Sequence, residues 1–291
     1  MVKLVALQMP RLTLDTSAIN ALANESDYLI AGVTAGFTVR LNGTNIDEIA
    51  ATPDADRRAR LLDVCRQLLV PGECVQPANV IIEQLVTEFH KGTRFEWARV
   101  NVKAPEYEEE IVRREIIDDK LSKDQKDFAK ELDKEFASIF RSARPKFEEI
   151  FSNGVSRPAT FAELVTVLQQ PGGSFWTGYG AAFYERFAGQ RPDESTVRRF
   201  VEACPPFRAL VLAVCLAQYE HCIKEPNSGP SYRAGCSDLL MAVYLPYCDQ
   251  FVTGDHRQER CLTEIGKVAG LTTEIRSYEA FRSQLTTLCT P

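Results

Sequence analysis

The chain has 291 residues, of which 45% are hydrophobic and 25% charged, a composition typical of a folded globular protein. Its formal net charge of −6 argues against binding of nucleic acid through one large basic surface. The sequence contains neither the run of ~20 apolar residues that a membrane span requires nor a long apolar leader, so we expect a cytoplasmic protein without membrane contact.

The first ninety residues alternate between short apolar runs and helical patterns. Residues 12–15 form an apolar run that ends on Asp15, which predicts a strand followed by a short helix. Two further runs, 28–34 and 37–41, are apolar and separated by glycine, so we predict strands there. The predicted helices of this region cover 17–24, a segment that starts at Thr44, 55–69 and 77–90.

The middle of the chain has a different composition. From residue 105 to about 153 acids and bases interleave at a spacing of four, as in Glu109 and Arg113. Apolar residues then recur every three or four positions from Phe128 onward, which predicts one or two long amphipathic helices. Further helical patterns continue to residue 223. We therefore expect residues 91–229 to form a mainly helical region that is inserted into, or covers, an α/β domain.

The last sixty residues return to an α/β pattern. A charge-poor run, 239–247, suits a buried helix opened by Asp238, and residues 250–253 suit a central strand. The later predicted elements are a helix over 257–269, a strand over 273–276 and a final helix from 277. Residues 1–90 and 230–291 would thus form one α/β domain.

Two of the predicted strands end on acids from opposite ends of the chain. Asp15 closes the first strand, and Asp255 follows the strand 250–253. Open α/β sheets bind ligands at the carboxyl ends of their strands, so both aspartates should reach one site. Carboxylates brought together repel each other and are costly to bury unpaired, which makes a cation their natural partner. The sequence therefore predicts a shared acidic metal site.

This pattern resembles the PIN-like nuclease domains. The matching segments are the strand that ends in Asp15-Thr16-Ser17, the helix that opens at Asp238, and Thr253-Gly254-Asp255 after the next strand. Members of that family carry a further glutamate early in a helix, for which Glu48 is the candidate. The resemblance covers the two ends of the chain, and residues 91–229 have no counterpart in the minimal domain.

The resemblance implies a PIN-like three-layer α/β fold with a central parallel sheet. It implies that Asp15, Glu48, Asp238 and Asp255 bind Mg²⁺ or Mn²⁺ through their oxygens. Metal-activated water would then hydrolyse phosphodiester bonds in RNA or another single-stranded nucleic acid. Thr253 or Ser237 would orient a ligand carboxylate or a phosphate oxygen. PIN-like domains often act as toxins or in defence, so an inhibitory protein partner is also implied.

The sequence leaves several alternatives open. Glu83 replaces Glu48 as the second acid if the second strand is 73–75. Each aspartate can instead cap a helix or belong to a turn. The aromatic segment 175–187 is typical of a core-facing helix rather than of a base-stacking surface. The competing function is a catalytically inactive PIN-like domain that serves as an interaction scaffold, with the charged helices 105–153 as its docking surface.

Overall fold

A computed structural model describes residues 9–69, 72–92, 94–113, 119–225 and 235–289. Its centre is one sheet of five parallel strands in the order β3-β2-β1-β4-β5. The strands are β1 (Arg11–Leu14), β2 (Thr38–Asn42), β3 (Glu73–Val75), β4 (Gln250–Thr253) and β5 (Glu274–Ser277). The predicted α/β class is therefore confirmed. Residues 1–8, on which the expected absence of a leader rests, lie outside the described residues.

Helices make up most of the remaining chain. The first five are α1 (Thr16–Leu22), α2 (Asp27–Gly36), α3 (Gly43–Ala50), α4 (Ala55–Leu69) and α5 (Ala78–His90). The middle contains η1 (Trp97–Arg99), α6 (Pro105–Arg113), α7 (Asp119–Ser152), α8 (Phe161–Leu168), η2 (Phe175–Gly180), α9 (Ala181–Ala188), α10 (Glu194–Ala203), α11 (Pro205–Gln218) and η3 (Tyr219–Ile223). The last are α12 (Cys236–Leu240), η4 (Met241–Tyr247), α13 (His256–Ala269) and α14 (Tyr278–Cys289).

One predicted strand, 28–34, is wrong, because α2 covers these residues. The buried residues of α2 are Leu29, Ile30 and Val33. Ile30 and Val33 lie one and four positions after Leu29, so the three residues share one helical face. A half-buried strand would instead bury every second residue. The apolar run is thus part of a helix with one buried face.

The two faces of the sheet belong to two hydrophobic clusters. Strand residues such as Leu12, Val39 and Val252 point to the first cluster, which α1, α2, α3, α4 and α14 cover. Phe251 and Val75 belong to the second cluster, which is formed with α5, α11, η4 and α13. Helices therefore cover both faces of the parallel sheet, as an all-parallel sheet requires because both of its faces are apolar.

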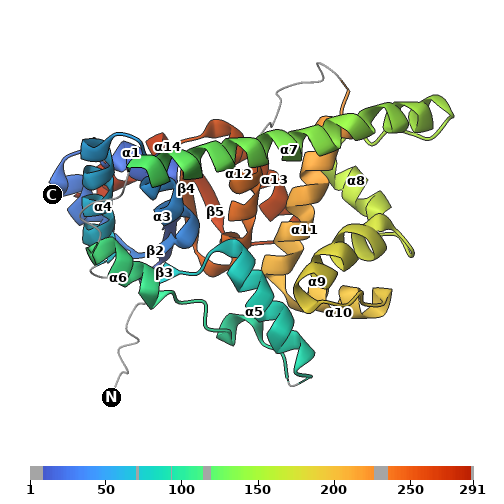
Figure 1. The fold of residues 1–291 in the computed structure, drawn as a ribbon, viewed down its shortest axis with the longest axis horizontal. Helices are drawn as coiled ribbons and strands as arrows, with labels where there is room; N and C mark the ends of the chain where they lie inside the picture. Colours follow the sequence, from blue (N-terminus) through green and yellow to red (C-terminus); the bar gives the residue numbers. More distant parts are fainter. Residues whose placement is uncertain (1–8, 70–71, 93, 114–118, 226–234, 290–291) are drawn as a thin grey trace.

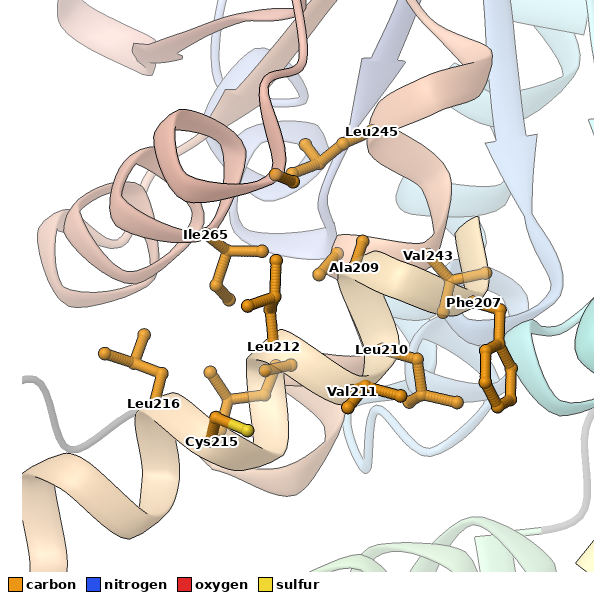
Figure 2. Packing of buried hydrophobic residues seen from close by; sticks show 14 of the residues in the cluster. Phe207, Ala209, Leu210, Val211, Leu212, Cys215, Leu216, Val243, Leu245 and Ile265 are labelled. Carbon is orange, nitrogen blue, oxygen red and sulfur yellow. The ribbon is translucent and has the colours of Figure 1, made fainter. Parts of the chain in front are cut away.

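Helices from the middle of the chain share the second cluster with the sheet. α11 is its centre: Leu212, Leu216 and their neighbours pack against residues of η4 and α13, as Figure 2 shows. Phe161 of α8 and Phe200 of α10 extend the same cluster outward. Phe175, Trp176 and Tyr184 are buried there too, which confirms the core-facing role predicted for the aromatic segment.

The long helix predicted within 105–153 is present as α7, which follows the shorter α6. α7 runs along one side of the molecule, past α3 and α12, and reaches η3 further on (Figure 1). It therefore contacts both the helix that carries Glu48 and the helix that carries Asp238.

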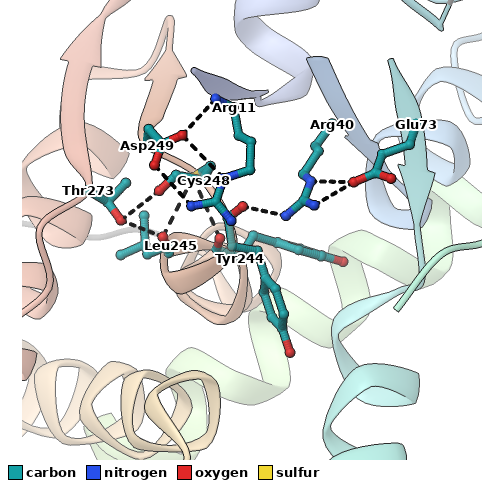
Figure 3. A network of polar contacts seen from close by, with 9 residues as sticks. Arg11, Arg40, Glu73, Tyr244, Leu245, Cys248, Asp249 and Thr273 are labelled. Carbon is teal, nitrogen blue, oxygen red and sulfur yellow. Dashed lines mark hydrogen bonds and ion pairs between the residues drawn. The ribbon is translucent and has the colours of Figure 1, made fainter. Parts of the chain in front are cut away.

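Ion pairs join the strands at the edge opposite their carboxyl ends. Arg40 donates from Nε to Glu73 Oε1 over 2.6 Å and from Nη1 to the carbonyl oxygen of Tyr247 over 2.5 Å. Arg11 forms a second, more exposed pair with Asp249, 3.0 Å apart (Figure 3). Asp249, which directly precedes β4, thus has a structural role in this ion pair.

We expect Arg40→Ala to lower the free energy of unfolding by about 2 kcal/mol, because the Tyr247 carbonyl and the half-buried Glu73 each lose a charged donor. Arg11→Ala is the matched control and should cost less than about 1 kcal/mol, since exposed pairs contribute little. Urea unfolding of the two variants measures the difference. Equal losses would show that burial does not distinguish the two pairs.

Within the described part of the chain, no single helix has the length and apolar composition to cross a membrane. One pair of consecutive helices in that part of the chain, Glu194–Ala203 and Pro205–Ile223, has this length and composition when taken together, but the two helices meet at a bend of 110°.

Candidate functional site

The acids predicted as a site lie at the carboxyl end of the sheet. Asp15 follows β1 and Asp255 follows β4, and these two strands are neighbours. The backbone N–H of Asp15 donates to the carbonyl oxygen of Val252, 3.0 Å away, which fixes the two strand ends together. The strand order reverses between β1 and β4, which is where ligand sites of open α/β sheets occur.

Asp15 is buried, and three hydrogen-bond donors hold its carboxylate. Ser17 Oγ lies 2.9 and 2.8 Å from its two carboxylate oxygens, the Ala18 N–H donates over 2.8 Å, and Thr253 Oγ1 donates over 3.0 Å. Burial raises the pKa of Asp15 even though these donors oppose the rise. The helix-capping alternative is thus observed, since Asp15 caps α1, and the same residue also belongs to the acidic cluster.

Thr253 and Ser17 connect the two strand ends through Asp15. Thr253 is fully buried, and its hydroxyl donates to Asp15 while accepting the Asp255 N–H over 2.9 Å. Ser17 Oγ accepts the Gly254 N–H over 2.7 Å. A Cβ on Gly254 would lie 2.9 Å from that oxygen, which explains the glycine at this position. Thr253 was predicted to orient either a carboxylate or a phosphate oxygen. Its hydrogen bond to Asp15 matches the first of these roles.

Asp238 lies in the first turn of α12. Its Oδ2 accepts the Gly235 N–H over 3.0 Å, and its Oδ1 accepts from Gln258 Nε2 over 3.2 Å. Burial raises the pKa of Asp238 to about 6, and the nearby charges of Asp255, Asp15 and Asp133 add to the rise. Ser237, beside it, is half-buried and makes no side-chain hydrogen bond to the described residues.

Glu48 lies on α3 and belongs to the same electrostatic group. The residue as a whole is exposed, but protein around its carboxyl group desolvates it. This desolvation, together with the charges of Asp238, Asp15 and Asp133, raises the pKa of Glu48 to about 7, while a hydrogen bond with Thr16 opposes the rise.

Glu83, the alternative second acid, lies on α5. Its side chain is exposed, and it is not among the charges that act most strongly on the pKa of Asp15, Glu48 or Asp238. The electrostatic coupling therefore favours Glu48 over Glu83 as the second acid of the cluster.

Asp255 lies at the exposed margin of the cluster. Its Oδ1 caps α13 by accepting the N–H groups of Arg257 and Gln258 over 2.6 and 3.3 Å. Its charge nevertheless raises the pKa of Asp238. Asp255 therefore caps a helix and is also close enough to Asp238 for its charge to act on that residue.

Two residues beside the acids, Asp133 and Gln258, could not be predicted as site residues from the sequence. Asp133 comes from α7, where it is one of many acids in a charged helix, yet its Oδ1 accepts the Cys236 N–H over 2.8 Å. Gln258 is 2% exposed and donates to Asp238, but nothing marks it among the polar residues of α13. Only the three-dimensional packing of α7 and α13 brings them to the acids.

The donor set suits a hard divalent cation. All four predicted acids offer oxygen, and like charges raise the pKa of two of them. The side-chain amide of Gln258 donates to Asp238 through Nε2. The buried Oε1 of the same amide has no hydrogen-bond partner among the described residues. Among those residues, however, no group of three or more His, Cys, Asp or Glu side chains has an arrangement that could hold a metal ion. The capping bonds of Asp15 and Asp255 direct their oxygens to backbone N–H groups instead.

Three comparisons with known proteins found no relative of this chain. The chain matches no protein-family model, no curated protein and no solved structure. Fold and site together define a parallel α/β protein with coupled carboxyl groups at the point where its strand order reverses.

The raised pKa values predict that the metal-free protein becomes less stable as the pH rises from 5 to 8. In the folded state Asp238 and Glu48 still bind protons near pH 6 and 7, whereas in the unfolded chain both are ionised above about pH 5. Their stabilising contribution is therefore present at low pH and is lost as the pH rises through 6 and 7. Because solvent screens the exposed Glu48, we expect a total loss of about 1–2 kcal/mol.

Urea unfolding in EDTA at several pH values measures this dependence. The double variant Glu48→Gln/Asp238→Asn should flatten the curve between pH 5 and 8. A slope unchanged by the double variant would assign the pH dependence to other groups.

Proposed function

We propose that the chain is a metal-dependent nuclease of the PIN-like class, most simply a ribonuclease. The observation that carries the proposal is the gathering of acids at the carboxyl ends of β1 and β4, where the charges of Asp15 and Asp238 reach Glu48 and the charge of Asp15 reaches Asp238. Like charges held together from three separate segments of the chain are unfavourable without a counter-ion, so such an arrangement is best explained by a cation that binds there.

The residues proposed to hold Mg²⁺ or Mn²⁺ are Asp15, Glu48 and Asp238, with Asp255 at the margin. A bound ion would supply activation of water and stabilisation of the leaving oxygen of a phosphodiester. The surrounding residues orient the carboxyl groups. Ser17 and Thr253 donate to Asp15, and Gln258 and the Gly235 N–H donate to Asp238.

The fold supports the assignment to the PIN-like class at a coarse level. The sheet is parallel, helices cover both faces, and the acids follow β1 and β4, as the resemblance of the two chain ends implies. We assign residues 1–90 and 230–291 to the nuclease domain and 91–229 to an inserted helical region. A cytoplasmic location and an inhibitory protein partner are parts of the same proposal.

The proposal is tested by incubating the purified protein with labelled RNA, and in parallel with single-stranded DNA, in the presence of Mn²⁺ or Mg²⁺. We expect metal-dependent cleavage by the wild type and none by Asp15→Asn/Asp238→Asn. EDTA should abolish cleavage, which separates the expected mechanism from that of a contaminating metal-independent ribonuclease. Equal cleavage by the double variant, or no cleavage by the wild type with either metal, rejects the nuclease.

A second function, an inactive PIN-like scaffold, is favoured by a different observation. In the described part of the chain the acids are not arranged to ligate a metal, and the carboxylate of Asp15 is fully engaged by protein donors. The charged outer faces of α6 and α7 would then be the docking surface. Isothermal titration with Mn²⁺ separates the two functions, because the scaffold requires no binding that depends on Asp238.

A further inference from the structure

We propose that Asp133, on the long helix α7, is a positioning residue that fixes Asp238 in the acidic site. The inference rests on the proposed function for the role of Asp238. It assigns part of the inserted helical region to the site itself. α7 contacts both α3 and α12, so it spans the two helices that carry Glu48 and Asp238.

The contact between α7 and α12 is a specific hydrogen bond. Asp133 Oδ1 accepts the backbone N–H of Cys236, the first residue of α12, over 2.8 Å. The preceding N–H, that of Gly235, donates to Asp238 Oδ2 over 3.0 Å. Two successive backbone donors are therefore divided between Asp133 and Asp238. Movement of Asp133 would release the turn that sets the position of the Asp238 carboxylate.

Gly235 shows how closely α7 approaches this turn. A Cβ on Gly235 would lie 2.8 and 2.9 Å from the two carboxylate oxygens of Asp133, closer than real Cβ contacts. A side chain at 235 and the carboxylate of Asp133 therefore cannot both occupy their present positions. Asp133 also raises the pKa of both Glu48 and Asp238, in agreement with the contacts that α7 makes with α3 and α12.

Cys236 provides a natural probe of this contact. It is half-buried, whereas the structure shows seven other cysteines as buried: Cys65, Cys74, Cys204, Cys215, Cys222, Cys248 and Cys261. Its rate of alkylation, measured by mass spectrometry of the peptide that contains it, reports opening of the start of α12. This measurement needs neither metal nor nuclease activity.

We expect Asp133→Ala to accelerate alkylation of Cys236 roughly tenfold, because a charge-assisted hydrogen bond is lost. Asp133→Asn should be clearly slower than Asp133→Ala, since its amide oxygen can still accept the Cys236 N–H. Both variants lose the charge that raises the pKa of the Cys236 thiol, so the difference between them measures the hydrogen bond, and equal rates would contradict the positioning role. Gly235→Ala should reproduce the effect of Asp133→Ala, and the double variant should be no faster than either one, because both changes break the same contact. Asp127→Ala is the control on the exposed part of α7 and should change nothing.

The second measurement is the affinity for Mn²⁺ by isothermal titration. Asp133→Ala should weaken binding roughly tenfold, as loss of a residue that orients a ligand does, while Asp133→Asn largely retains it. If Asn and Ala weaken binding equally, Asp133 acts through its charge or as a ligand, and the positioning role is wrong. Unchanged Cys236 alkylation in Asp133→Ala also overturns it. A wild type that neither binds Mn²⁺ nor cleaves RNA rejects the proposed function, and the alkylation rates still decide whether Asp133 holds α12.

Discussion

Glu48→Gln is expected to lower metal-dependent RNA cleavage by at least about 100-fold, while Glu83→Gln leaves cleavage within about twofold of wild type. The difference follows from the surroundings of the two residues. Glu48 is coupled to Asp15 and Asp238, and removal of its charge weakens the attraction for a cation that serves both. Glu83 is an exposed residue of α5 and is not among the main influences on those acids.

Initial rates of RNA cleavage at saturating Mn²⁺, measured for both variants in parallel, provide the test. Glu48→Gln removes one of several like charges, so it should not lower the free energy of unfolding in EDTA at pH 8. A loss of activity is then not a loss of folding. If Glu83→Gln is the variant that loses activity, the second acid has been misassigned.

Leu212→Ala is expected to produce the largest loss of stability, about 3 kcal/mol in the free energy of unfolding. Leu212 is 1% exposed and lies on α11, the helix of the inserted region that packs against η4 and α13, among the residues that Figure 2 shows in the second cluster. Truncation removes buried contacts and leaves a cavity that a close-packed core does not readily fill.

Val167→Ala is the control for this prediction. Val167 lies on α8 and is 59% exposed, so its truncation should change stability by no more than about 0.5 kcal/mol. Urea or thermal unfolding followed by circular dichroism compares the two variants. Similar small effects would mean that α11 and its neighbours do not form one cooperative core with the sheet.

Much of the fold was predictable because its strands are short apolar runs with clear ends. The run 250–253 is β4 with the predicted bounds, and β1 and β5 differ from their predicted ranges by one residue at each end. The strand predicted at 28–34 failed because apolar residues fill most positions of that segment, and a continuous run carries little information on period. The helical period of the segment 105–153 correctly predicted helices there, but it did not indicate which elements α7 would contact.

The candidate site was predictable to the extent that it follows strand ends. Asp15 comes directly after β1 and Asp255 two residues after β4, and these strands pair with each other, so the order of residues places both acids at one edge of the sheet. The choice between Glu48 and Glu83 depends on how α3 and α5 pack, which local sequence does not encode. Asp133 and Gln258 lie beyond such reasoning, because each reaches Asp238 through contacts between distant helices.

The central position of β1 has a consequence for the order of events during synthesis. β1, β2 and β3 leave the ribosome early, but one edge of β1 waits for β4, and Thr253 is 238 positions away from Asp15. Until then Asp15 has neither the Thr253 hydroxyl nor Asp238 beside it, so a nascent chain has no assembled acidic cluster. The nuclease that we propose would therefore gain its acidic cluster only after residues 238–255 have been synthesised and have packed beside β1. Until β4 pairs with it, β1 has an exposed strand edge, and such an edge favours aggregation.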